Sequence, residues 1–196
     1  MESRIMIVDD EANILQSLRR LLGAVPCAYG KFSFDLYLET YVSARTALEH
    51  ASHQPFDMFI SDYRMPEMDG VSFLKQVRET QPDAAFLILS GYADLNGLMR
   101  AINEVGIQRF ISKPWNDYEL VSTIAQTLSS RALLQENRQL ANLMRRDCGD
   151  ITPQEYEATM LESVEPGITK VNWGPDGSVL LEPEEANAAP LPARLR

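Results

Sequence analysis

The chain has 196 residues, of which 45% are hydrophobic and 23% charged, a composition typical of a folded domain rather than of a disordered segment. Its formal net charge of −10 argues against nucleic acid or an anionic membrane as the main partner, because both require clustered positive charge. No apolar run reaches the roughly 18 residues that cross a bilayer, and the first residues do not resemble a signal peptide. Two distant cysteines argue against a disulfide framework or a zinc site, so we expect a cytoplasmic protein.

Short apolar runs alternate with helical patterns through the first two-thirds of the chain. This alternation predicts five β–α units, and therefore an α/β fold with a five-stranded parallel sheet between helices. The predicted strands are Ile5–Val8, Leu36–Val42, Phe56–Ser61, Ala85–Leu89 and Ile107–Ile111. The predicted helices lie around residues 14–22, 44–51, 71–77 and 95–105, and residues 24–35 are predicted to form a loop.

A final helix is predicted to begin near Asn116 and to meet no stop signal before Gly149, a span of about 30 residues. Its second half places Leu133, Asn137, Leu140 and Met144 at 4-3-4 spacing, the spacing of a coiled-coil seam with an inner asparagine. We therefore predict a homodimer through these four residues. Only about two heptads are present, so the alternative that this helix folds back on its own domain stays open.

The acidity is concentrated late in the chain. Residues 150–185 carry nine acidic side chains and one lysine, whereas residues 1–149 have a net charge of only −4. Thr152 and Pro153 predict a helix start, and two β-type runs around residues 174–177 predict a hairpin. The resulting division is a domain at 1–128, a helical extension at 129–149, an acidic helix and hairpin appendage at 150–185, and a disordered tail at 186–196.

Polar residues stand where four of the predicted strands end. Asp9 and Asp10 follow the first strand, Asp62 the third, Ser90 the fourth and Lys113 the fifth. The carboxyl ends of parallel strands line one crevice, so these side chains should converge. Clustered carboxylates need a cation such as Mg²⁺, beside which an aspartate can attack a phosphoryl group while a lysine and a hydroxyl offset its charge. Each residue alone could be a helix cap or a surface group; the four strand ends together favour the chemistry.

Four strings carry a resemblance to a known family: IMIVDDE, FDMFISDYRMPEMDGVSFLK, FLILSGYAD and RFISKPW. Over about residues 3–130 the chain resembles the receiver domain of two-component response regulators. The resemblance implies a flavodoxin-like (CheY-like) fold that accepts a phosphoryl group from a sensor histidine kinase or phosphotransfer protein. The stretch Gly23–Asp35 is longer than the connection usual in the family.

The resemblance also assigns roles to individual residues. Asp62 would be the phosphoacceptor, and Mg²⁺ would be held by Asp9, Asp10, Asp62 and the backbone carbonyl of Arg64. By the same match, Lys113 would pair with the phosphoryl group, Ser90 and Phe110 would be the switch residues, and Lys113–Pro114 would be a cis peptide.

The implied function is a response regulator that phosphorylates and dephosphorylates itself rather than a turnover enzyme, and that relays the signal through dimerisation or protein contacts. No known output motif follows residue 130. Two alternatives remain: a transcription regulator with an unrecognised DNA-binding output, and a phosphatase-type enzyme. The acidic segment 150–185 speaks against the first, and the absence of a DxDx(T/V) nucleophile motif speaks against the second.

Overall fold

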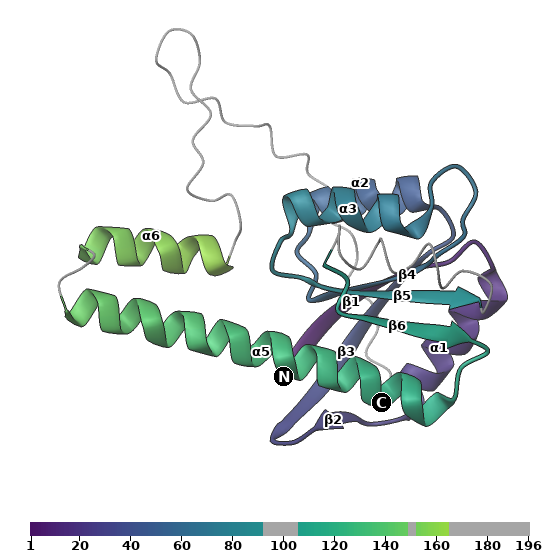
Figure 1. The fold of residues 1–196 in the computed structure, drawn as a ribbon, viewed down its shortest axis with the longest axis horizontal. Coiled ribbons are helices and arrows are strands. Elements are labelled where there is room, and N and C mark those ends of the chain that lie inside the picture. The colour runs from purple at the N-terminus through teal and green to yellow at the C-terminus, as the bar shows by residue number, and fades with distance from the viewer. Residues whose placement is uncertain (92–105, 149–151, 165–196) are drawn as a thin grey trace, which may run out of the picture. The chain divides into compact units, whose positions relative to one another are not determined.

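The computed structural model describes residues 1–91, 106–148 and 152–164. The helix predicted at 95–105 and the hairpin predicted at 168–181 lie outside these residues. The described strands are β1 (Glu2–Val8), β2 (Cys27–Tyr29), β3 (Phe32–Tyr41), β4 (Met58–Asp62), β5 (Ala85–Gly91) and β6 (Arg109–Lys113). The described helices are α1 (Ala12–Ala24), α2 (Ala44–His53), α3 (Gly70–Thr80), α5 (Asp117–Asp147) and α6 (Pro153–Val164) (Figure 1).

The strands form one sheet in the order β2-β3-β1-β4-β5-β6. Five neighbouring strands in this order, β3, β1, β4, β5 and β6, are parallel, as the alternating pattern predicts. The central strands β1, β4 and β5 consist almost entirely of buried residues, which is why their sequences are continuous apolar runs. The register pairs Asp62 with Leu89 and Ser90 with Ser112, so the polar strand ends lie at one edge of the sheet.

Helices cover both faces of this sheet. One core contains buried residues of α1 and α5, such as Leu18 and Ile124, packed on one face. The other contains buried residues of α2 and α3, such as Ala47 and Phe73, packed on the opposite face. Figure 1 shows α2 and α3 on one side of the sheet and α5 on the other. The predicted sandwich of a parallel sheet between helices is confirmed.

The prediction of a loop over residues 24–35 is wrong. These residues contain β2 and the start of β3, which pair in antiparallel fashion and add a sixth strand to the sheet. A two-residue turn joins the strands, and its first residue, Gly30, has a φ of 59°, a conformation that glycine adopts without strain. Cys27 and Phe34 face the α1–α5 core and are buried. The long connection between α1 and β3 is therefore a hairpin.

α5 is one continuous helix of 31 residues. Asn116 caps its start, since the side chain of this residue accepts hydrogen bonds from the backbone of Tyr118 and Glu119. Its first half is built into the core through Leu120, Ile124 and Leu128, as 3.6-residue periodicity requires. Its second half carries apolar side chains that are largely exposed, so only the first half is held by burial.

Ion pairs extend the attachment of α5 beyond its buried half. Arg131 donates to the carbonyl of Asp83 at 2.8 Å and contacts the carboxylate of Asp57 at 2.5 Å. Asp57 also accepts the backbone N–H of Arg4 at 2.8 Å, so a single carboxylate links α5 to β1. Further along, Arg138 pairs with Asp83, and Lys31 of the hairpin lies 3.5 Å from Glu136.

The helix start predicted at Thr152 is confirmed. Thr152 accepts the N–H of Glu155, and the carboxylate of Glu155 accepts the N–H of Thr152 at 2.8 Å, which is a reciprocal capping box. The chain divides into two compact units, Met1–Tyr156 and Glu157–Arg196. In the ranges that the structure describes, no helix has the length and apolar character needed to cross a bilayer.

Candidate functional site

The crevice at the carboxyl edge of the sheet brings together three of the predicted residues from three strand ends. Lys113, at the end of β6, donates from Nζ to Oδ2 of Asp9 at 2.7 Å and pairs with Oδ1 of Asp62. Asp9, which follows β1, is fully buried, and the side chain of Asp62 at the end of β4 is 9% exposed. Two carboxylates thus share one ammonium group in a nearly dry site.

Burial and pairing shift the pKa values of this cluster. Burial raises the pKa of Asp9 above its usual value, although Lys113 and the backbone N–H of Glu11 act in the opposite direction. The nearby carboxylate of Asp62 raises the Asp9 pKa further. Burial lowers the pKa of Lys113, but its hydrogen bonds to Asp62 and Asp9 outweigh this effect, and the pKa is raised overall. Lys113 is therefore a charged group held in place by its two anionic partners.

The loop after β4 fixes the orientation of Asp62. Oδ2 of Asp62 accepts the backbone N–H of Arg64 at 2.8 Å. The chain then returns so that Gly70, at the start of α3, donates its N–H to the carbonyl of Tyr63 at 3.1 Å. A Cβ atom on Gly70 would lie 2.0 Å from the carbonyl oxygen of Asp62, so only glycine permits this approach. Asp69 caps α3 by accepting the N–H of Ser72 at 2.8 Å.

Among the described residues, no hydrogen bond or ion pair joins Ser90, Asp10 or Phe110 to this cluster. Ser90 is buried at the end of β5, next to β4, and its hydroxyl donates to the carbonyl of Gly91 at 3.2 Å. Asp10 is exposed at the start of the turn into α1. Phe110 is 43% exposed on β6, and Lys113–Pro114 is a cis peptide, as the resemblance implied.

The donor set of the crevice suits a hard cation. All its candidate ligands are oxygens, namely carboxylates and the carbonyl of Arg64, and a single lysine leaves the pair of buried carboxylates with excess negative charge. Among the residues that the structure describes, no three acidic, histidine or cysteine side chains group closely enough to surround a metal ion. The two buried carboxylates of Asp9 and Asp62 fit Mg²⁺, which usually takes one or two carboxylates and completes its shell with water and phosphate oxygens.

Sequence reasoning did not single out two features that the structure places near the chemistry or its output. The close approach of Gly70 to Asp62 was hidden in a motif that reads as an ordinary turn. The link from Asp57 to Arg131 joins residues 74 apart, and a charged pair at that separation leaves no pattern in a single sequence.

This fold and site define a flavodoxin-like α/β domain with two buried carboxylates and a lysine clustered at its carboxyl edge. A family model for the response regulator receiver domain matches residues 5–125. The hydrogenase transcriptional regulatory protein HoxA of Cupriavidus necator is 33% identical over 132 residues, covering 67% of this chain and 25% of that protein. The chain belongs to the response regulator receiver domain family.

Solved structures agree with this assignment. The signal receiver domain of an HD domain-containing protein from Pseudomonas fluorescens Pf-5 matches with a TM-score of 0.60 at 32% identity, covering 68% of this chain and 92% of that one. A response regulator receiver domain protein from Clostridium thermocellum matches with a TM-score of 0.59 at 26% identity, covering 67% and 98%. The chain spans about a quarter of the length of curated relatives such as HoxA, so the match covers their receiver part.

Proposed function

We propose that the crevice accepts a phosphoryl group on Asp62 from a sensor histidine kinase or a phosphotransfer protein. A carboxylate oxygen of Asp62 attacks the phosphorus of a phosphohistidine, the P–N bond breaks, and the released imidazole takes up a proton as an acyl phosphate forms. The observation that supports this most strongly is the double pairing of Lys113 with Asp62 and Asp9, which places a cation beside the reacting carboxylate.

Each residue of the crevice has a distinct role in the proposal. Lys113 offsets the charge of the transferred group, and the buried hydroxyl of Ser90 turns from the carbonyl of Gly91 to donate to a phosphoryl oxygen. A bound Mg²⁺, held by Asp9, Asp10, Asp62 and the carbonyl of Arg64, would neutralise charge on the phosphoryl oxygens. The N–H of Arg64 keeps Asp62 oriented before transfer.

The expected result with a small phosphoryl donor is direct. Incubation of the full chain with acetyl phosphate and Mg²⁺ adds one phosphoryl group, seen by intact-mass spectrometry, and Asp62→Asn removes the adduct. The matched control is Asp57→Asn, another aspartate beside β4, which keeps the adduct because it lies at the opposite end of that strand. A wild-type chain that stays unmodified would contradict the proposal.

We further propose that phosphorylation is read through assembly and protein contacts. Ser90 and Lys113 move towards the new phosphate, and the half-exposed ring of Phe110, three residues before Lys113 on β6, changes its position. The proposed dimer uses Leu133, Asn137, Leu140 and Met144, all of which are exposed on α5. The ion pair of Arg138 with Asp83 attaches α5 to its own domain, yet Leu140 is 49% and Met144 67% exposed. Because these side chains stay uncovered although the helix is attached, their exposure favours a dimer over a helix that folds back on its own domain.

Sedimentation tests this seam. Wild type is expected to run as a dimer at micromolar concentration, and Leu133→Asp combined with Leu140→Asp as a monomer, because charges at inner positions of a helix pair destabilise it. Gln139→Asp adds a negative charge at an exposed position outside the 4-3-4 series and should leave the dimer intact. Monomeric wild type under these conditions would contradict the seam.

In this proposal the domain comprises residues 1–128, the helical extension 129–149, the acidic appendage 150–185 and the tail 186–196. The protein acts in the cytoplasm and turns over no external substrate. HoxA is a transcriptional regulator by name, but the match covers a quarter of it, and it supplies no observation that favours DNA contact by this chain.

A further inference from the structure

β3 is an edge strand over the part of its length that β2 does not cover. β2 pairs only with Phe32–Phe34, and within the described ranges no strand pairs with the outer edge of residues 35–41. None of these seven residues is buried, whereas residues 5–8 of the neighbouring strand β1 all are. At the usual rise of a strand, the open edge is roughly 23 Å long.

Backbone groups suitable for strand pairing point out from this edge. The N–H of Asp35 donates to the carbonyl of the first residue, and the carbonyl of Tyr41 accepts from Asp9, so both face β1. Successive residues of a strand alternate in direction, so the intervening ones face outwards. Arg19 of α1 donates to the outward carbonyl of Leu38 at 3.2 Å, which agrees with this assignment. The outward groups are those of Leu36, Leu38 and Thr40.

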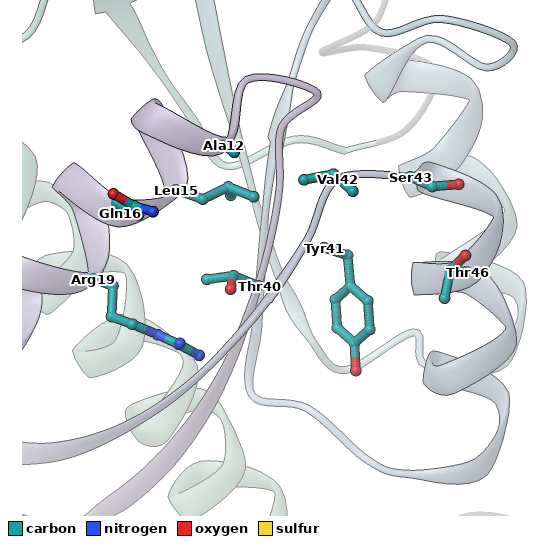
Figure 2. Close-up of a pocket in the computed structure, with 9 residues that line it drawn as sticks. All are labelled: Ala12, Leu15, Gln16, Arg19, Thr40, Tyr41, Val42, Ser43 and Thr46. Atoms are coloured by element: carbon teal, nitrogen blue, oxygen red, sulfur yellow. The ribbon is translucent and has the colours of Figure 1, made fainter.

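A hollow of about 400 Å³ lies beside this edge (Figure 2). On one side α1 contributes Ala12 and Gln16 and, one turn further, Arg19, which share one face of the helix. On the other side lie Ser43, just before α2, and Thr46 of the first turn of that helix. Figure 2 shows β3 passing between these two walls, with the side chain of Arg19 directed towards the strand. The end of the open edge, at Thr40 and Tyr41, therefore forms the floor of this hollow. We call the open edge and the hollow together the groove.

We propose that this groove binds an extended segment of a partner protein by strand addition to β3. About five residues of such a segment can pair along the outward groups while an apolar side chain enters the hollow. Arg19 is the charged side chain among the described residues that line it. When an incoming N–H takes over the carbonyl of Leu38, the guanidinium becomes available to a carboxylate, so the preferred segment carries an acidic residue near its apolar one.

The geometry disfavours a second copy of β3 as the occupant. An antiparallel copy centred on Leu38 would place its Val42 opposite Phe34, and that position is already taken by Cys27 of β2. A short separate segment meets no such obstacle. This inference does not depend on phosphorylation of Asp62, and it is tested with the unphosphorylated full chain.

The probe is the heptapeptide acetyl-Glu-Val-Thr-Val-Thr-Val-Glu-amide, whose glutamates at both ends serve either strand direction. Titrated into the isotope-labelled full chain, it should shift the amide signals of Leu36, Leu38 and Thr40 and slow their hydrogen exchange at least about tenfold. The inward amides of Tyr37 and Glu39 should change little. Saturation is expected below about 1 mM peptide. The same peptide with N-methylated valines should not bind, because it lacks the backbone N–H groups that would pair with β3.

Two variants separate backbone pairing from charge. Thr40→Pro removes one outward N–H and should abolish binding, with preserved inward amide signals showing that the sheet is intact. Arg19→Gln should lower the affinity for the heptapeptide about tenfold. It should not change the affinity for the same peptide with glutamines in place of both glutamates. Arg20→Gln, on the same helix beside a separate hollow next to Trp115, should change neither. No saturable shift, or alternating shifts that appear on raising the protein concentration alone, would overturn the proposal.

Discussion

Gly70→Ala is expected to lower the free energy of unfolding by roughly 3 kcal/mol, the upper part of the range for overpacking a close-packed site. The added Cβ would lie 2.0 Å from the carbonyl oxygen of Asp62 and 2.8 Å from the hydroxyl of Ser61, and neither can yield cheaply. Ser61 is fully buried and Asp62 ends a central strand. Relief therefore requires displacing the backbone that carries the proposed phosphoacceptor.

Urea unfolding of the full chain measures the loss in the free energy of unfolding. Labelling with acetyl phosphate measures the effect on Asp62, and the extent of labelling should fall together with the stability. Gly23→Ala is the matched control, since nothing lies within 4 Å of a Cβ at that exposed helical position. That variant should gain about 0.5 kcal/mol from helix propensity. Equal stabilities for Gly70→Ala and wild type would show that α3 does not approach β4 as described.

Lys113→Met is expected to cost roughly 3 kcal/mol near neutral pH, because removing one partner of a buried ion pair leaves its counter-charge unpaired. Here two carboxylates, those of Asp9 and Asp62, lose the same cation. Lys75→Met removes an exposed lysine of α3 and should change stability by less than about 0.5 kcal/mol. A loss as small as that of the control would mean that the crevice is solvated enough to screen both charges.

The pH dependence gives a second test of the same variant. The folded-state pKa of Asp9 lies above 3.8, so the folded protein holds this proton more tightly and the contribution of Asp9 to stability falls as pH rises through that pKa. Lys113 lowers the pKa of Asp9, so Lys113→Met should raise this pKa further. The stability of the variant should therefore fall more steeply than that of wild type as pH rises. The difference in the free energy of unfolding between Lys113→Met and wild type should therefore become smaller as the pH is lowered from about 7.5 to about 4.

Wild type should show a further, separate loss at high pH. The folded-state pKa of Lys113 lies above 10.5, so its contribution is fully present below that pH and is lost as pH rises through the folded value. Lys113→Met lacks this titration and should lack that part of the alkaline loss. Urea titrations of both chains across this range measure it, and identical alkaline slopes would contradict the pairing.

Much of the fold was predictable because burial leaves a local signature. The strands β1, β4 and β5 are buried along nearly their whole length, so each appears as a continuous apolar run, and α5 shows helical periodicity until its stop signals. The carboxyl-edge residues Asp9, Asp62 and Lys113 were predictable for a topological reason, since parallel strands present their ends at one edge. The contact of Lys113 with both aspartates follows from that arrangement.

The rest depended on features that carry little local signal. β2 has three residues and only Cys27 among them is buried, so its alternation is too short to distinguish from a loop. The turn at Gly30 offered the available clue, a glycine at the first position of a two-residue connection between Tyr29 and Phe32. The attachment of α5 through Arg131 and Asp57 depends on distant charges that only the folded chain brings together.

The continuity of α5 has a mechanical consequence. The 17 residues from Arg131 to Asp147 extend about 25 Å beyond the buried half of the helix. A rigid rod pivoting at its base multiplies displacement in proportion to length, so a sub-ångström shift where β6 meets α5 becomes a movement of several times that size at the far end. The ion pairs of Arg131, Arg138 and Lys31 lie at or near the surface, where dissolved salt screens them. Higher ionic strength should therefore increase the mobility of the second half of α5.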